Sequence, residues 1–380
     1  MMICARCIYD DKVSGINFDS EGVCNYCHQV GELLEKFGTG TSAGKLEFER
    51  IVNAIKTSHA KKKYDCIVGV SGGTDSSYVL FLAVKMGLRP LAVHYDNTWN
   101  SAIATQNIAI VTKKLNVDLI TYVVNNQEQD EIKRALLKSG VPEFDSDTDL
   151  AFAQVLRSVA AKNGIKYILE GHSFVTEGVS PIGGNYFDGA YIKSIFKAFG
   201  RGKMKTYPMM GFWTFLKWTI IYRQKFIRPL WYLDYDKDAA RKVLSVELGW
   251  RYYGGHHLEN KASAFIHTVW LPQRFNVDFR NLVLAANVRR GIQSRSEAIE
   301  IYSQPVVVDK KLIKYVQKRL GLDDSEYEKL MNGPRRNWRD FKTYKRRFEL
   351  LRPLFYLLTK FNLVPMSFYL KYCFPIKADK

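Results

Sequence analysis

The sequence lacks the long apolar segments that membrane-spanning and exported proteins require. Although 47% of its 380 residues are hydrophobic, no run of 18 uninterrupted apolar residues occurs, which excludes a spanning helix. The first residues, MMICARCIYDD, contain no apolar core of the length that a signal peptide needs. We therefore expect a cytoplasmic protein with a sizeable core of its own.

Cysteine is scarce outside the N-terminus. Four of the six cysteines stand within the first 27 residues as two C-x-x-C pairs, unlike the even scatter of a secreted disulfide framework. The spacing of Cys4, Cys7, Cys24 and Cys27 matches a zinc ribbon, in which two knuckles supply four thiolates to one Zn²⁺. An iron–sulfur cluster or, less in keeping with a reducing compartment, disulfides are the alternatives. His28 is interpreted as a bystander, because four thiolates fill such a site.

Acidic residues are too few to balance the basic ones, and the formal net charge is +18. Such a charge indicates an acidic partner: nucleic acid, an anionic membrane or a phosphorylated substrate. Residues 334–380 contain twelve Lys or Arg against three acids, a net charge of +9, interleaved with LLRPLFYLLTKFNLVPMSFYL. This pattern is typical of a membrane-surface helix or a nucleic-acid arm, and equally of a solvated helix that packs on the body.

The middle of the chain alternates between strand and helix patterns. A helical pattern over 45–63 precedes apolar runs of strand length, separated by amphipathic helical segments. These runs are 65–70, 90–94, 118–124 and 165–170. The alternation predicts an α/β fold with a parallel sheet and helices on both faces. Beyond about residue 200 the pattern is aromatic, basic and mainly helical, and we interpret 211–235 as a core helix with a solvated face rather than an interfacial helix.

The loop SGGTDSS, residues 71–77, stands between a predicted strand and a predicted helix. Glycines, backbone N–H groups and a following helix N-terminus are what a phosphate-binding loop needs. The spacing and lysine of a Walker A loop are missing, and so is the G-x-G-x-x-G dinucleotide fingerprint. A loop with an aspartate and no lysine offsets phosphate charge most simply if Asp75 holds or orients Mg²⁺. The alternative is a helix N-cap in an ordinary α/β domain.

This loop, after a strand, resembles the pyrophosphate-binding loop of the N-type ATP pyrophosphatases, the PP-loop superfamily with its adenine nucleotide alpha hydrolase-like fold. GMP synthetase, NAD synthetase, asparagine synthetase and several tRNA-thiolating enzymes belong to it. The resemblance implies cleavage of ATP between the α and β phosphates, an adenylated intermediate and released pyrophosphate, with Asp75 near the metal. The residues that it implies around the pyrophosphate are Ser71, Gly72, Gly73, Thr74, Ser76 and Ser77.

Two more strand ends carry polar residues. Asp96 and Asn97 follow the second strand at the carboxyl edge of the sheet, where α/β folds bind ligands, and the resemblance implies nucleotide recognition there. Gly171, His172, Thr176 and Glu177 follow the 165–170 strand into the same crevice. By resemblance to NAD synthetase, Glu177 is the second expected magnesium ligand. His172 is expected to be catalytic or, equally, to hydrogen-bond a ligand residue.

Five separated segments narrow the family. They are CARCIYDDKVSGINFDSEGVCNYC, GHSFVTEG, FGRGKMKTYPMMGF, LDYDKDAARKVLSVELGWRYYGGHHLEN and LPQRFNVDFR. In this order they resemble the N-acetyl sugar amidotransferases of bacterial surface-polysaccharide biosynthesis, such as O-antigen and pseudaminic or legionaminic acid pathways. The resemblance covers most of residues 1 to about 310, and the tail beyond about 330 lies outside it. GGHHLEN looks like a site segment, with the roles of His256 and His257 left open.

The resemblance implies a reaction that converts an acetamido group of a nucleotide-linked sugar to an acetamidino group. An amide oxygen attacks the α-phosphate of ATP, pyrophosphate leaves, ammonia adds to the O-adenylyl imidate, and AMP departs. Lys203 and Lys205, in GRGKMKTYP, are expected to clamp the developing phosphate charge, or else to belong to a solvated basic loop. The expected catalytic residues are thus Asp75, Lys203, Lys205 and His172.

The chain has neither of the cysteine arrangements that a glutaminase uses. We therefore expect a separate glutaminase subunit with a cyclase-like companion, similar to the pair in imidazole glycerol phosphate synthase, to supply ammonia. A peripheral contact with the anionic inner membrane is a further expectation, whereas nucleic acid is disfavoured. Two rival functions are a PP-loop tRNA-thiolating enzyme and a non-catalytic zinc-ribbon adaptor. Cys66 and Cys373 form no further C-x-x-C pair, which counts against sulfur transfer.

These patterns divide the chain into four predicted segments. They are a zinc ribbon (1–40), a PP-loop ATP pyrophosphatase domain (41–205), a helical sugar-nucleotide region (206–330) and a basic aromatic tail (331–380).

Overall fold

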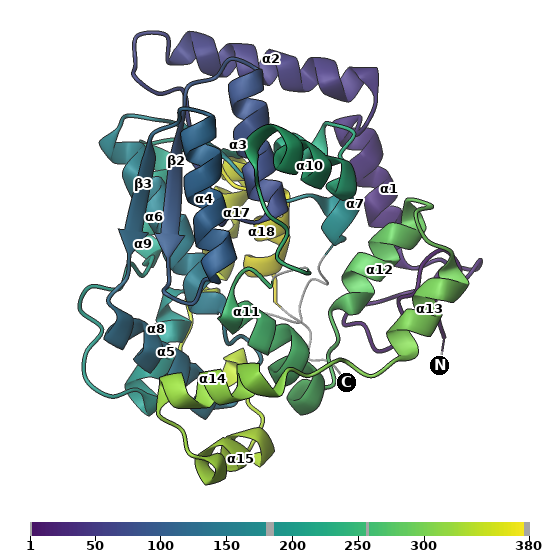
Figure 1. Ribbon diagram of the computed structural model, residues 1–380, viewed down its shortest axis with the longest axis vertical. Helices are drawn as coiled ribbons and strands as arrows, with labels where there is room; N and C mark the ends of the chain where they lie inside the picture. The colour runs from purple at the N-terminus through teal and green to yellow at the C-terminus, as the bar shows by residue number, and fades with distance from the viewer. Residues whose placement is uncertain (1, 180–185, 256–257, 376–380) are drawn as a thin grey trace.

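A parallel five-stranded sheet forms the centre of the protein, whose computed structural model describes residues 2–179, 186–255 and 258–375 (Figure 1). The strand order is β3-β2-β1-β4-β5, and every pair of neighbours is parallel. The strands are β1 (Cys66–Gly69), β2 (Pro90–Asp96), β3 (Leu119–Val123), β4 (Tyr167–Leu169) and β5 (Lys225–Ile227). The expected α/β fold class is confirmed.

The central strand β1 is buried along its whole length. Ile67 belongs to the apolar cluster on one face of the sheet, whereas Cys66 and Val68 belong to the cluster on the other face. Successive side chains of a strand point to opposite faces, so a strand covered on both sides reads as a continuous apolar run.

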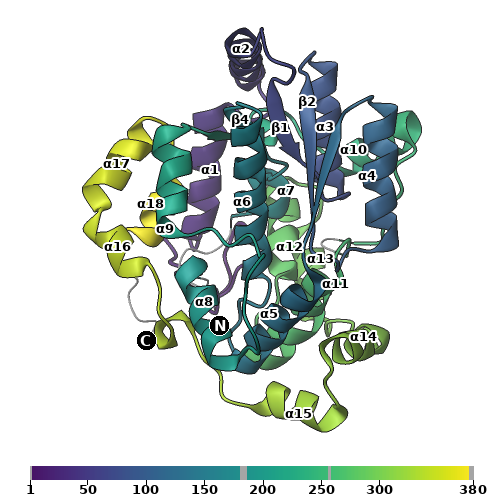
Figure 2. The same ribbon diagram turned by 90° about the vertical axis from the view of Figure 1, so that its left-hand side faces the viewer.

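Helices cover both faces of the sheet (Figure 2). The cluster of Ile67 is completed by α5 (Asn126–Ser139), α6 (Ser146–Lys162) and α8 (Gly189–Phe199). The cluster of Val68 is completed by α2 (Ser42–Ser58), α3 (Thr74–Lys85), α4 (Ala102–Lys114) and α10 (Lys237–Val243) with its extension η3 (Leu244–Leu248).

The prediction of a helix over 211–235 is wrong for part of that range, because strand β5 lies within it. The segment begins as α9 (Phe212–Leu216), continues in the π-helical η1 (Lys217–Ile221), and ends at Arg223, whose φ is +48°. The chain then pairs with β4 and turns through η2 (Pro229–Trp231). A strand of three residues is too short to leave an alternating pattern in the sequence.

The sheet changes its winding direction between β1 and β4. The chain proceeds from β1 through β2 to β3 on one side, whereas β4 and β5 lie on the other. Such a switch point leaves a ligand-binding crevice at the carboxyl ends of the strands. The loops after β1 and β4 approach closely here, because a Cβ on Gly171 would lie only 2.8 Å from the backbone nitrogen of Ser76.

The N-terminal module packs against helices from the C-terminal half (Figure 1). Its cysteines share an apolar cluster with Leu284, Ala285 and Ala298.

Further helices lie outside the layers that cover the two faces of the sheet. They include α1 (Asn25–Phe37), α7 (Phe174–Glu177), α11 (Lys261–Phe265), η4 (Ile266–Phe275), α12 (Arg280–Arg289), α13 (Arg295–Ser303), α14 (Lys310–Leu320), α15 (Asp324–Asn332) and η5 (Trp338–Asp340).

The basic tail is helical and its inner side packs on α9. Phe212 and Leu216 share a cluster with Phe348 and Phe355. The tail helices are α16 (Lys345–Leu350), α17 (Arg352–Lys360) and α18 (Met366–Tyr372). Among the helices of the described ranges, none combines the length and hydropathy that a bilayer span requires. The division of the chain into four domains stays a prediction.

Candidate active site and metal centre

The loop at residues 71–77 joins β1 to α3 at the switch point. Its backbone turns at Gly72, where φ is +80° and a Cβ would lie 2.2 Å from the Ala104 carbonyl oxygen. Glycine is therefore required. The N-cap of α3 is Gly73, which has no side chain to bind the first amides of the helix. The N–H groups at this helix N-terminus are consequently available to an anion.

Side chains from distant segments fix the back of this loop. The Gly72 carbonyl oxygen accepts hydrogen bonds from Trp250 Nε1 at 3.0 Å and Asn107 Nδ2 at 3.2 Å. At the front, the hydroxyl oxygens of Ser71 and Ser76 lie 3.2 Å apart. These contacts hold the backbone of the loop in position.

Asp75, in the first turn of α3, links the loop to α10. Lys237 Nζ lies 2.8 Å from Asp75 Oδ2 and 3.9 Å from Glu177 Oε1. The hydroxyl of Tyr235 donates to Asp75 Oδ1. The exposed fractions of the side chains are 18% for Lys237, 16% for Asp75 and 19% for Glu177. The two residues expected to bind magnesium therefore face the same cation.

The two carboxylates hold the Lys237 ammonium in its charged form. Burial alone would lower the pKa of Lys237, but the charges of Asp75 and Glu177 outweigh it and raise this pKa above its ordinary value. Carboxylate oxygens are also the protein ligands that Mg²⁺ prefers. The donor set fits Mg²⁺, whose binding here stays a prediction.

His172 lies beside Glu177, with Nε2 3.9 Å from Glu177 Oε2. Burial and then the charge of Arg228 lower the pKa of His172 to about 4, although 45% of the side chain is exposed. The ring is therefore neutral at pH 7, and its Nδ1 accepts a hydrogen bond from Trp231 Nε1 at 3.2 Å. In this tautomer the ring proton is on Nε2, which faces Glu177. A neutral His172 that donates toward Glu177 would orient this carboxylate, so a positioning role is favoured for His172.

Nearby in sequence, Thr176 Oγ1 is buried without a hydrogen-bond partner among the described residues.

The polar residues at the end of β2 accept hydrogen bonds from the loop that follows them and from the C-terminal half. Asp96 Oδ1 accepts from the backbone nitrogen of Thr98 at 2.7 Å. Asn97 is buried, and its Oδ1 accepts from Trp99 N at 3.0 Å and Asn260 Nδ2 at 2.9 Å. Asn97 thus fixes a neighbouring segment, and nucleotide recognition by Asp96 and Asn97 stays a prediction.

A cavity of about 390 Å³ opens from the loop along the carboxyl edge of the sheet. Ser71, His94 and Asn97 line its sheet side, and Glu143 and Ser263 line its far side. Burial raises the pKa of Glu143 to about 7, and its Oε2 accepts from the hydroxyl of Tyr191 at 2.9 Å. The cavity therefore offers several hydrogen-bonding groups next to the place where phosphate would bind.

Lys203 and Lys205 lie elsewhere on the sheet edge. Both side chains are exposed, and the backbone nitrogen of Lys205 donates to Glu128 Oε1 at 2.8 Å, near the start of α5. Neither lysine is among the residues that line the cavity. The lysine that contacts Asp75 is instead Lys237, so the clamp expected of Lys203 and Lys205 has no support from this geometry.

Lys237 and Tyr235, which contact Asp75, are not predictable from the sequence as residues of this site. Both stand in the run LDYDKDAARKVLSVELGWRYYGGHHLEN, which contributed to the family resemblance but contains no spacing motif for a phosphate or metal site. Glu259, from the same run, lines the cavity. His256 and His257 lie outside the described residues.

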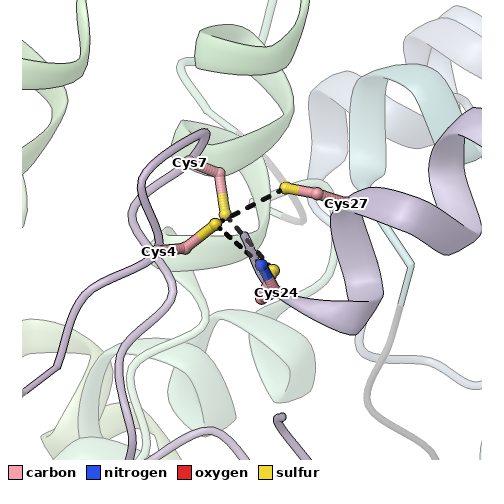
Figure 3. Close-up of side chains that lie close together, drawn as sticks. All are labelled: Cys4, Cys7, Cys24 and Cys27. Atoms are coloured by element: carbon pink, nitrogen blue, oxygen red, sulfur yellow. Dashed lines mark hydrogen bonds between the residues drawn. The ribbon is translucent and has the colours of Figure 1, made fainter. Parts of the chain in front are cut away.

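The four N-terminal cysteines converge on one point (Figure 3). Their sulfur atoms all lie within 4.8 Å of one another and are buried. The Sγ atoms of Cys4 and Cys27, and those of Cys7 and Cys24, are 3.8 Å apart. A tetrahedron with Zn–S bonds of about 2.3 Å has ligands about 3.8 Å apart. The cluster fits a single tetrahedral ion better than a wider iron–sulfur cluster, and the identity of the ion stays a prediction.

Two arginines from the C-terminal half bind this cluster. Arg289 donates to Cys27 Sγ at 3.2 Å and to Cys7 Sγ at 3.4 Å. Arg295 Nε lies 3.0 Å from the carbonyl oxygens of both Cys4 and Cys7. Four thiolates around a divalent cation carry a net charge of −2, which the Arg289 guanidinium partly offsets.

Residues 259–354 match the family model described as LPS biosynthesis protein WbpG-like, C-terminal domain. The resemblance to proteins of surface-polysaccharide biosynthesis is thus confirmed for this part of the chain. The match extends past residue 330 into the tail, so the expectation that the tail lies outside the resemblance is wrong as far as residue 354.

A curated relative from Methanocaldococcus jannaschii, the uncharacterized protein MJ1599, is 31% identical over 173 residues. The match covers 45% of this chain and 59% of that protein, so the chain spans less than two thirds of the length of this relative.

Three solved structures are similar at low TM-scores. NMN synthetase from Francisella tularensis is 15% identical, with 72% of this chain and 92% of that chain covered, at a TM-score of 0.32. The U34-tRNA thiolase NcsA from Methanococcus maripaludis with its 4Fe-4S cluster is 12% identical. The match covers 85% of this chain and 99% of that chain, at a TM-score of 0.33. A predicted subunit of tRNA methyltransferase from Methanocaldococcus jannaschii is 12% identical. The match covers 57% of this chain and 90% of that chain, at a TM-score of 0.27. Similarities of this size bear on neither the activity nor the ligands of this chain.

Proposed function

Because residues 259–354 carry a WbpG-like C-terminal domain of LPS biosynthesis, we propose that the chain is an ATP-dependent amidotransferase acting on a nucleotide-linked acetamido sugar. The observation that carries the proposal is the meeting of Asp75, Glu177 and Lys237 beside an uncapped helix N-terminus. This arrangement suits an enzyme that separates pyrophosphate from ATP.

The loop at 71–77 binds the departing pyrophosphate in this proposal. Its backbone N–H groups donate to the phosphate oxygens, and Lys237 offsets the charge that grows as the bond between the α and β phosphates breaks. Asp75 and Glu177 would hold Mg²⁺, which supplies further neutralisation of phosphate charge. Tyr253 and Glu259 also stand at the loop, since a Cβ on Gly73 would lie 3.2 Å from Tyr253 Oη and 3.4 Å from Glu259 Oε1.

The cavity beside Ser71 would hold the acetamido sugar. The amide oxygen forms a bond to the α-phosphorus, pyrophosphate leaves, and the product is an O-adenylyl imidate and pyrophosphate. Ammonia then adds to the imidate carbon, the bond from that carbon to oxygen breaks, and AMP departs with one proton released, which leaves the amidine. Hydroxyl and carboxyl groups such as those of Ser263 and Glu143 suit the recognition of sugar hydroxyls.

The source of ammonia in the proposal is a separate glutaminase subunit with a cyclase-like companion. The two cysteines outside the metal cluster are both buried, and burial raises the pKa of the Cys66 thiol above its ordinary value and that of Cys373 to about 11. A thiol held protonated in this way is a poor nucleophile for glutamine hydrolysis. The same observation counts against sulfur transfer, and therefore against the rival tRNA-thiolating function.

The proposal predicts which acceptor triggers ATP cleavage. With ATP, Mg²⁺ and ammonium chloride, release of AMP and pyrophosphate is expected with UDP-linked or CMP-linked acetamido sugars. Bulk tRNA is expected to give none. Mass spectrometry should show a sugar product in which NH replaces the amide oxygen. Release that requires tRNA, or no release with any acceptor, would overturn the proposal.

Lys237→Gln is expected to slow pyrophosphate release by roughly 100-fold. The glutamine is polar and similar in bulk, but it removes the charge that lies 2.8 Å from Asp75. The matched control is Lys242→Gln, an exposed lysine on the same helix, which is expected to keep the original rate. In steady-state kinetics, the lower rate of Lys237→Gln is expected to appear mainly as a lower kcat. If Lys237→Gln and Lys242→Gln released pyrophosphate at equal rates, the proposed role of Lys237 would be wrong.

A further inference from the structure

The tail and the α9–η1 segment form an apolar cluster of their own on one side of the protein (Figure 2). Its core joins Phe212 and Leu216 with Phe348, Phe355 and Leu358. The inner sides of these helices are therefore buried against one another, and a further partner can bind only to their outer sides.

The outer side of the α9–η1 segment is apolar. Trp213 is 72% exposed and Ile221 is 71% exposed. Lys217, midway between them, is also exposed, and a spacing of four residues places all three side chains on one face of the helix. These apolar side chains stand on the face that we interpret as solvated, although the solvated face of a helix is normally polar.

The tail helices continue the apolar surface. Leu350, Leu357 and Phe361 are 74%, 54% and 68% exposed. Leu350 is the last residue of α16, Leu357 and Phe361 are four residues apart at the end of α17, and the exposed Lys360 stands next to Phe361. Further large apolar side chains with exposed fractions above 40% in α17 and α18 are Tyr356, Met366 and Leu370.

The same surface is strongly cationic. Residues 211–225 contain three basic residues and no acidic one. Residues 341–375 contain seven basic residues and a single acid, Glu349, whose Oε1 lies 3.6 Å from Lys345 Nζ. Lys345 itself is buried, whereas Lys342, Arg346, Arg347 and Lys360 are exposed. A partner that covers this surface must therefore be apolar and anionic at once.

We propose that this surface docks on an anionic lipid bilayer. Short helices that lie in the plane of the bilayer insert aromatic and aliphatic side chains at the boundary of the acyl chains, while Lys and Arg bind lipid phosphates. Lysines inside the apolar stripes suit this arrangement, because their long stems let the ammonium reach the headgroups. The cores of protein interfaces, in contrast, are depleted in lysine.

Vesicle flotation of the full chain tests the docking surface. Binding is expected to vesicles of phosphatidylcholine with about 30% phosphatidylglycerol, and not to phosphatidylcholine alone. Removing apolar side chains with Trp213→Ser, Leu357→Gln and Phe361→Ser is expected to lower the partition coefficient about tenfold for each substitution. Lys217→Gln and Lys360→Gln should lower it roughly fivefold each.

Leu46→Gln and Val307→Gln are the matched controls, since these side chains are 64% and 87% exposed but lie outside the surface. Both variants are expected to float like the unaltered chain. No binding to anionic vesicles, equal binding to neutral ones, or full binding by the Trp213, Leu357 and Phe361 variants would overturn the proposal. A dimer in sedimentation that these variants abolish, without vesicle binding, would assign the surface to a second copy instead. None of the altered residues belongs to the ATP site, so flotation and activity can fail independently.

Discussion

The Asp75→Asn variant is expected to release pyrophosphate about 100-fold to 1,000-fold more slowly than the unaltered chain. Asp75 accepts a hydrogen bond from Tyr235, lies 2.8 Å from Lys237 Nζ, and stands in the first turn of the helix behind the loop. Asparagine preserves the size of the side chain and removes its charge. The proposed Mg²⁺ ligand and the partner that orients the lysine are thus lost in one step.

Asp238→Asn is the control for this substitution. Asp238 is 75% exposed on the neighbouring helix, and its Oδ1 lies 2.6 Å from Arg241 Nη1. Its variant is expected to retain the original rate. Pyrophosphate release is measured at saturating ATP over a range of Mg²⁺ concentrations, with thermal unfolding as the check on folding. If Asp75→Asn kept a rate within severalfold of the original, the proposed mechanism at this loop would fail.

The parts of the site that follow from local sequence could be predicted. The buried run of β1 and the loop after it are contiguous, and the position of the loop at the end of a buried strand follows from the alternation of strands and helices. The four cysteines are predictable for the same reason, because their spacing in two pairs is itself the signal of a metal site. In each case one short segment contains all the information that is needed.

The parts that tertiary contacts create could not be predicted. Tyr235 and Asp75 are 160 residues apart in the sequence, and only the packing of α10 beside α3 brings Tyr235 and Lys237 to the loop. Lys203 and Lys205 looked suitable because of their charge, but Glu128 binds their segment at another part of the sheet edge. Charge and spacing carry no information on such contacts.

The cysteine cluster is connected to the proposed ATP site through close contacts around Gly178. Gly178 directly follows Glu177, and a Cβ on it would lie 3.1 Å from the carbonyl oxygen of Leu282 in α12 and 3.6 Å from Tyr9 Oη in the N-terminal module. Arg289, from the same helix α12, binds the cysteine sulfurs. The position of Glu177 therefore depends on both the module and α12.

Cys24→Ala is accordingly expected to abolish metal binding, to unfold the N-terminal module locally, and to lower pyrophosphate release by roughly tenfold or more. Structural Zn²⁺ contributes apparent binding free energies of about 10–16 kcal/mol in small zinc peptides, and the apo forms of such peptides are unfolded. Without the ion, the four thiols that share one buried site would lose the interaction that holds them together. Tyr9 would then no longer support the segment after Glu177.

Metal content and hydrogen–deuterium exchange separate the two effects of this variant. Exchange is expected to rise over residues 2–24 and over α7, while the strands of the sheet keep their protection. The control is Cys373→Ala, which removes a buried thiol outside the cluster and is expected to retain the metal and the exchange pattern of the N-terminal module. If Cys24→Ala lost the metal but kept both the protection of α7 and the original rate, the cluster would stabilise only its own module, and the connection to Glu177 through Tyr9 would be refuted.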